Sequence, residues 1–260
     1  MIAALGLLLL AFTATDWYQK ANAYFAEGKF SEAGAALEQA LRLEPKLVPA
    51  LTLKAKLAMG FNQFDTAREC LLKAAELEPN SPYVQFLLGF FFYVDNDFNK
   101  AVPPLEKARK LNPADPRPVF YLAMTQEGLG RADAAIPLYD EALELEARAG
   151  KPQPDTLVAY ARLLYTLGQL EKSEEMIQRA LRLDINSRDA QYEMGRLLYE
   201  KRDYQGAVAR GEKALGLAGP GTTDRQIHFL LGRAYLKAGD RGRAEEHLAK
   251  FRAAAPSLRR

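Results

Sequence analysis

The chain has very few of the residues that metal and redox sites need. Its 260 residues include one cysteine, Cys70, and two histidines, His228 and His247. One cysteine cannot form an internal disulfide, and one thiol with two imidazoles is too few for a Cys/His zinc site. The two histidines also fall on different predicted helices. We therefore expect no metal site, and we interpret all three side chains as packing or surface residues.

Motifs for catalysis and cofactor binding are also missing. The sequence contains no glycine-rich phosphate loop and no metal-ligand motif. Adjacent carboxylates such as Glu174 and Glu175 point about 100° apart on a helix, so they cannot act on one reacting atom. We predict no catalytic residues, no cofactor, no small-molecule substrate and no enzymatic activity.

The chain lacks the large excess of basic over acidic residues that is typical of proteins that bind polyanions. Thirty-five basic and 33 acidic residues leave a net charge of +2, which disfavours a protein whose main work is to coat a phosphate backbone. The apolar fraction of 48% and the charged fraction of 26% are those of a folded protein, which disfavours disorder.

The first fourteen residues, MIAALGLLLLAFTA, contain no charged side chain. The stretch is too short to span a bilayer, and its length and apolar character suit the core of a secretory signal peptide. Two features fit a signal peptide poorly: no Lys or Arg precedes the stretch, and Phe12 would lie close before a cleavage site after Ala14. The alternative is a helix that covers the next segment. We expect an exported protein, periplasmic or extracytoplasmic, if residues 1–14 are a signal peptide, and a cytoplasmic one otherwise.

What the chain does have is a repeat of 34 residues. Ala40, Ala74 and Ala108 follow one another at this interval, and periods of this size indicate stacked helical hairpins. Residues 150–153 and 222–224 interrupt the register, and we expect the greatest freedom there. The predicted solenoid occupies residues 15–258, and its seven repeats run over 14–47, 48–81, 82–115, 116–149, 154–187, 188–221 and 225–258.

Two columns of small residues recur within the repeats, where we expect two helices to approach closely. Within the first repeat, apolar residues at helical spacing lie on both sides of Gly28, so each unit is predicted to be two helices joined by a tight turn. We number the places of a repeat from its first residue, so that residue 14 is place one of the first repeat. Place eight of the seven repeats holds Ala21, Ala55, Gly89, Ala123, Ala161, Gly195 and Gly232. Place twenty holds Ala33, Ala67, Ala101, Ala135, Ser173, Ala207 and Ala244.

Trp17, Ala21, Ala33, Ala40 and Pro45 stand at places four, eight, twenty, twenty-seven and thirty-two of the first repeat. This pattern resembles the tetratricopeptide repeat (TPR) family. The resemblance implies an all-α fold, a right-handed superhelical solenoid of about seven helix-turn-helix repeats. It also implies a concave face, made by the first helix of each repeat, that binds peptides or protein segments.

Places five, nine and twelve of each first helix share one face, which the resemblance identifies as the concave one. Aromatic residues and arginine, which are common at binding hot spots, are frequent in these columns. We predict a peptide-binding groove made by Tyr18, Asn22, Lys56, Phe86, Phe90, Tyr93, Phe120, Arg162, Tyr165, Tyr192, Arg196, Tyr199, Phe229 and Arg233.

Two alternatives to binding stay open for these columns. The phenylalanines at 86, 90 and 120 could pack against neighbouring repeats or against a helix formed by residues 1–14. The three arginines could form ion pairs with Glu193, Glu200 or Asp189. Binding is the favoured interpretation, because a face that only meets solvent would not need aromatic residues.

The partner we expect is a protein or peptide with acidic and aromatic residues, held by a scaffold that could serve assembly of an envelope complex. Single-stranded RNA binding by a helical repeat protein is the alternative, since Tyr and Arg can stack on bases. The constant period of 34 and the balanced charge disfavour nucleic acid. A homo-oligomer that forms through the last repeat is also open, because the apolar side chains of Leu248 and Phe251 need cover there.

Overall fold

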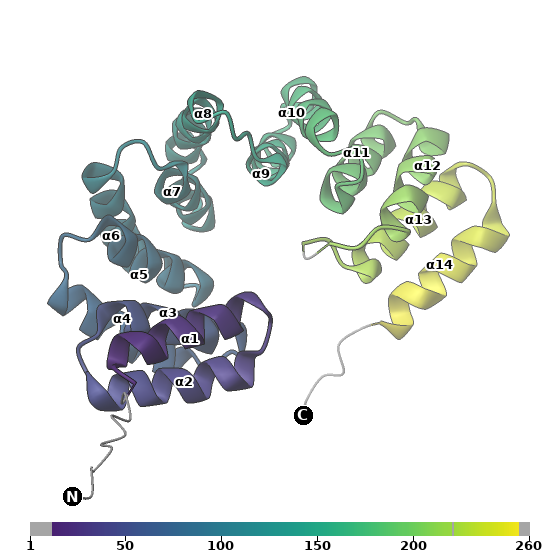
Figure 1. Cartoon of the computed structure of the whole chain (residues 1–260). Coiled ribbons are helices and arrows are strands. Elements are labelled where there is room, and N and C mark those ends of the chain that lie inside the picture. The colour runs from purple at the N-terminus through teal and green to yellow at the C-terminus, as the bar shows by residue number, and fades with distance from the viewer. Residues whose placement is uncertain (1–11, 220, 255–260) are drawn as a thin grey trace, which may run out of the picture. The chain divides into compact units, whose positions relative to one another are not determined.

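The computed structural model describes residues 12–219 and 221–254. These residues form fourteen α-helices and no strand, so the all-α helical-repeat solenoid is confirmed (Figure 1). The helices are α1 Ala14–Ala26, α2 Phe30–Leu43, α3 Val48–Gly60, α4 Phe64–Leu77, α5 Pro82–Val94, α6 Phe98–Leu111, α7 Pro116–Gly128, α8 Ala132–Arg148, α9 Pro154–Thr166, α10 Leu170–Leu183, α11 Arg188–Glu200, α12 Tyr204–Leu215, α13 Asp224–Lys237 and α14 Arg241–Ala253.

The chain divides into two compact units. The first ends at Leu129 and contains α1 to α7, and the second begins at Gly130 and contains α8 to α14. Within the first unit, α1 packs on α2, α3 on α4 and α5 on α6; within the second, α9 packs on α10, α11 on α12 and α13 on α14. The division lies inside the fourth predicted repeat.

The turn between the two helices of a pair needs one residue with a left-handed backbone. Gly28 provides it in the first pair, with φ of +74°, where a side chain would be strained. Asn62 and Asn96 take the same role in the next two pairs, both with φ of 58°, which asparagine tolerates better than most residues. The turn is therefore conserved in shape although the residue changes.

Close approach of paired helices depends on the small residues at place eight. A Cβ added to Gly89 on α5 would lie 2.5 Å from the Leu105 Cγ of α6 and 3.1 Å from its backbone nitrogen. A Cβ on Gly232 of α13 would lie 2.7 Å from the Leu248 Cγ of α14. The side chain of the second helix thus fills the space that glycine leaves.

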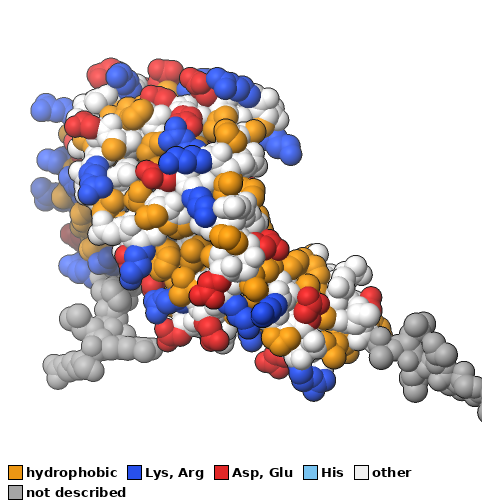
Figure 2. All heavy atoms as spheres, turned by 90° about the vertical axis from the view of Figure 1, so that its left-hand side faces the viewer, with side chains coloured by type: hydrophobic (Ala, Val, Ile, Leu, Met, Phe, Trp, Pro, Cys, Tyr) orange, Lys and Arg blue, Asp and Glu red, His pale blue; other side chains and the backbone are white. Residues whose placement is uncertain are grey.

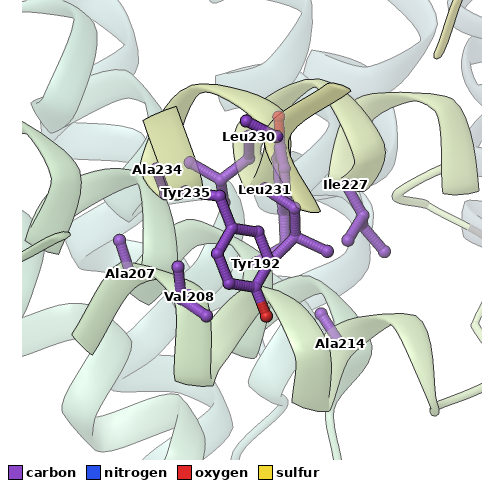
Figure 3. Packing of buried hydrophobic residues seen from close by; sticks show 10 residues of the cluster. Tyr192, Ala207, Val208, Ala214, Ile227, Leu230, Leu231, Ala234 and Tyr235 are labelled. Atoms are coloured by element: carbon purple, nitrogen blue, oxygen red, sulfur yellow. The ribbon is translucent and has the colours of Figure 1, made fainter. Parts of the chain in front are cut away.

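Neighbouring pairs share one core, as the second unit shows. Figure 3 shows Tyr192 of α11, Val208 of α12 and Leu231 of α13 gathered in one cluster of buried side chains. Leu231 is fully buried and Tyr192 is 9% exposed. In the second unit, α9 and α11 therefore each pack both on their own partner helix and on the next pair.

Hydrogen bonds tie down both of the longer linkers. The buried carboxylate of Glu146, at the end of α8, accepts from the Thr156 hydroxyl and from the Gln153 amide at the start of α9. Burial raises the pKa of Glu146, although these hydrogen bonds oppose the shift. In the other linker, the Thr222 amide donates to the Asp189 carboxylate. The freedom expected in these segments is thus limited by side chains of the adjoining helices.

Of residues 1–14, predicted to be a signal peptide or a covering helix, residues 1–11 lie outside the described part of the chain. The Phe12 ring packs on Trp17 with centroids 5.3 Å apart, and Thr13 forms a capping box with Asp16 at the start of α1. No helix among residues 12–219 and 221–254 is long and apolar enough to cross a membrane.

Candidate binding groove

The seven groove residues predicted in the second unit line one cavity of about 450 Å³. The cavity is formed by the first helices of three successive pairs, α9, α11 and α13. Places nine and twelve of α9, for example, put Arg162 and Tyr165 one turn apart on the same face. The lining consists of Arg162, Tyr165, Tyr192, Glu193, Arg196, Tyr199, Glu200, Gly221, Thr222, Gln226, Phe229, Leu230 and Arg233.

Glu193 lies between two of the predicted arginines. Its side chain is 3% exposed, with Oε1 3.1 Å from Arg162 Nε and Oε2 2.6 Å from Arg196 Nη1. A buried carboxylate is stable in the charged form only when such partners compensate it. The ion-pairing alternative therefore holds for Arg162 and Arg196, which help to neutralise Glu193.

The other two candidate carboxylates have different partners. Glu200 accepts a hydrogen bond of 3.2 Å from the Tyr165 hydroxyl, and Asp189 accepts from the Thr222 amide. Burial raises the pKa of Tyr165 and of Tyr192, so both phenols stay protonated at neutral pH. The Glu200 side chain adds a negative charge to the rim of the cavity.

Aromatic rings support the guanidinium groups. Arg196 lies 4.2 Å from the Tyr165 ring centroid, and Arg233 lies 4.5 Å from that of Tyr199 and 5.5 Å from that of Phe229. Such contacts fix the plane of a guanidinium and leave its N–H edges open. Arg233 is exposed and has no carboxylate partner among the described residues.

Groove residues predicted in the first unit fall into two groups. Tyr18, Asn22 and Lys56 line a smaller cavity of about 260 Å³, together with Tyr83 and other residues of α1, α3 and α5. The Lys56 ammonium lies 5.0 Å from the Phe25 ring centroid. This cavity has no arginine in its lining.

The ring of Tyr121 on α7 contacts all four of the remaining predicted residues, Phe86, Phe90, Tyr93 and Phe120. Ring centroids of Phe90 and Phe120 lie 4.7 Å and 5.1 Å from that of Tyr121. Phe86 is 7% exposed and packs on Phe90 and Tyr121, so the packing alternative holds for Phe86. Phe90, Tyr93 and Phe120 are partly exposed and can still present ring surface.

The structure also brings together two histidines that the sequence places on different predicted helices. His228 of α13 and His247 of α14 lie with their Nδ1 atoms 3.0 Å apart, and His247 is buried. The described residues contain no cluster of three or more metal-ligating side chains.

Cys70 is buried, and burial raises the pKa of its thiol, which disfavours a reactive thiolate.

Comparison with known proteins decides the family. Tetratricopeptide repeat profiles match residues 24–89, 92–153, 159–221 and 226–250. The chain belongs to the tetratricopeptide repeat family. TPR proteins are generally non-catalytic scaffolds that bind other proteins or peptides, and the family agrees with the fold described above. A comparison with curated protein sequences finds no match.

Several solved structures share the TPR fold. The Cut9-Hcn1 hetero-tetramer of the APC/C matches with a TM-score of 0.74 and 19% identity over 85% of this chain, which spans 43% of that one. A tetratricopeptide repeat protein from Parabacteroides merdae matches with a TM-score of 0.72 and 15% identity over 94% of both chains. Human IFIT1, solved as a dimer with m7Gppp-AAAA, matches with a TM-score of 0.63 and 20% identity, over 93% of this chain and 60% of its own. At these identities the likeness establishes the fold alone.

Proposed function

We propose that this TPR protein is a non-catalytic scaffold that binds an extended peptide or protein segment in the groove of α9, α11 and α13. The observation that carries the proposal is the cavity of about 450 Å³ on three successive first helices. Its walls combine tyrosine and phenylalanine rings with guanidinium groups, which together favour a segment with aromatic or aliphatic side chains and acidic groups.

The groove suits a peptide better than a nucleic acid. Glu193 and Glu200 line the same cavity as the three arginines, so a run of phosphates would meet negative as well as positive side chains. Figure 2 shows basic and acidic side chains interspersed on the face that it draws, in keeping with the balanced net charge of the chain. Single-stranded RNA binding remains the alternative function, because the tyrosines could stack on bases.

Selection of short random peptides displayed on phage tests the proposal. The full chain should enrich a set of related peptides, and replacing Tyr199 and Phe229 together by alanine should abolish their binding. The matched control is Leu183→Ala, since Leu183 is exposed on α10 but does not line the cavity. Equal binding by the groove variant, or enrichment of nothing, would contradict the proposal. Tight, salt-sensitive binding of mixed single-stranded RNA in a filter assay would favour the alternative.

Export, with a role in assembling an envelope complex, is a further proposal. It is supported by the charge-free apolar character of residues 1–14. Mass spectrometry of the native protein should show that mature chains lack about these residues. An intact Met1 on cytoplasmic protein would contradict export and favour a covering helix.

Self-association through the last repeat receives less support from the packing than from the sequence. Leu248 fills the space beside Gly232, and the Phe251 ring lies 4.9 Å from that of Phe229 and 4.3 Å from the Arg225 guanidinium. Both residues thus have cover within one chain. Analytical ultracentrifugation of the full chain distinguishes a monomer from the predicted homo-oligomer.

A further inference from the structure

The three arginines of the groove differ in how much positive charge they can offer a ligand. Arg162 and Arg196 share the carboxylate of Glu193, which is buried beside them at 3.1 Å and 2.6 Å. Arg233 shares its position in the repeat with them, at place nine, but has no acidic neighbour within ion-pair distance among the described residues. The positive charge of the three groove arginines is therefore neutralised in part, at Arg162 and Arg196.

We infer that Arg233 is the carboxylate receptor of the groove and that it selects one acidic side chain flanked by apolar residues, rather than an acidic run. This inference rests on the proposed peptide-binding function and specifies its ligand. A second ligand carboxylate placed at Arg162 or Arg196 would come close to Glu193, and the two like charges would repel each other in a partly desolvated site.

Arg233 is also prepared for this role by its surroundings. Tyr199 of α11 and Phe229 of α13 contact the guanidinium through their rings, at 4.5 Å and 5.5 Å, and leave its hydrogen-bond donors unused. A guanidinium held this way presents a fork that matches a carboxylate with two parallel hydrogen bonds. The ordering cost of binding is lower than for a freely rotating side chain.

Apolar surface lies directly beside the receptor. Phe229 stands one helical turn before Arg233 on α13, and Leu236 stands three residues after it; the two side chains are 41% and 53% exposed. Residues at these spacings share one helix face. A segment whose acidic group reaches Arg233 can therefore bury apolar side chains on both sides of it.

A charge-reversal experiment tests the inference. Short random peptides displayed on phage are selected against the wild-type full chain and against Arg233→Glu. The wild type should enrich peptides with a single Asp or Glu near aromatic or aliphatic residues, and Arg233→Glu should exchange that position for Lys or Arg while keeping the apolar ones. Wild-type-selected peptides should bind Arg233→Ala at least about tenfold more weakly.

The matched control is Lys237→Glu, which reverses a charge on the same helix at an exposed position outside the cavity. This variant should select the same peptides as the wild type. Enriched peptides with several acidic residues, or binding that is unchanged in Arg233→Ala, would overturn the inference while leaving peptide binding intact. If the wild type enriches no peptide that depends on Tyr199 and Phe229, the proposed function itself fails, and the inference fails with it.

Discussion

The Nδ1 atoms of His228 and His247 lie 3.0 Å apart across the contact between α13 and α14. A contact this short is a hydrogen bond only when one proton is shared between the two nitrogens, because two imidazolium ions would repel each other. The surrounding groups differ in sign: His247 Nε2 lies 3.4 Å from Glu212 Oε1 on α12, while Lys250 of α14 acts on His228. We therefore expect the docking of the last helix to depend on the protonation of His228.

We predict that acid weakens the docking of α14. Burial, His247 and Lys250 lower the pKa of His228 from its ordinary value of 6.5, so the unfolded chain binds a proton more readily than the folded one. The stability contributed by neutral His228 is full above that ordinary value and is lost as the pH falls below it. Hydrogen exchange of the α14 amides should therefore speed up between about pH 7.5 and about pH 5.5, after correction for the intrinsic rate.

His228→Gln is the control for this effect, because it removes the imidazole whose pKa is lowered. The pH dependence of α14 protection should be flatter in this variant than in the wild type. The same pH dependence in both proteins would show that other groups, such as the carboxylates, cause the acid effect.

Removing Arg196 should destabilise the second unit, whereas removing Arg233 should not. Arg196→Ala takes one of two cationic partners from the buried Glu193, at an expected cost of about 1–3 kcal/mol in the free energy of unfolding. Arg233→Ala removes an exposed side chain that pairs with no carboxylate of the described chain and should change stability by less than about 0.5 kcal/mol. Urea denaturation followed by circular dichroism measures both.

Glu193→Gln combined with Arg196→Ala shows whether the loss comes from a buried carboxylate that keeps only Arg162 as its cationic partner. The Glu193→Gln change removes the buried charge and should recover part of the stability. No recovery would mean that Arg196 contributes mainly through its packing on the Tyr165 ring.

The first long linker should depend on Glu146. Glu146→Ala leaves the Thr156 hydroxyl and the Gln153 amide without their acceptor and should cost about 1–3 kcal/mol. Glu144→Ala on the same helix removes only an exposed ion pair with Arg148 and should cost less than about 1 kcal/mol. Thermal melts of the two variants test the difference, and equal costs would contradict a specific role for Glu146.

Glycines at place eight should differ in their tolerance of alanine. At Gly89 the new Cβ would lie 2.5 Å from the branch carbon of Leu105, so Gly89→Ala should cost about 1–3 kcal/mol through overpacking. At Gly195 the nearest atom is the terminal Cδ2 of Leu230 at 3.0 Å, which can move, and the helix preference for alanine offsets much of the cost. Denaturation midpoints should therefore rank Gly89→Ala below Gly195→Ala.

Gly60→Ala serves as the control for these glycine substitutions. Gly60 is the last residue of α3, and a Cβ there meets nothing within 4 Å. The variant should be as stable as the wild type or slightly more stable. A loss of stability similar to that of Gly89→Ala would show that contact with the paired helix is not what decides the cost.

The sequence by itself determined the fold, because the information is local and repeated. Small residues at places eight and twenty, such as Ala21 and Ala33, recur every 34 residues and specify where helices pack, and Gly28 specifies where one helix turns into the next. The same pattern recurs in each repeat, so it can still be recognised where one position differs, as at the turn where Asn62 replaces glycine.

Only the tertiary structure decided which polar groups of the groove are already paired. Arg162, Arg196 and Arg233 are equivalent in the sequence, and Glu193, Glu200 and Asp189 were equivalent candidates to pair with them. In the structure, Glu193 forms ion pairs with two arginines. Glu200 accepts a hydrogen bond from the Tyr165 hydroxyl, and Asp189 accepts one from the Thr222 amide. Apart from Arg196, which lies three residues after Glu193 on the same helix, these partners are about one repeat apart. Their pairing depends on side-chain directions and burial across neighbouring helices, which a periodic pattern does not encode.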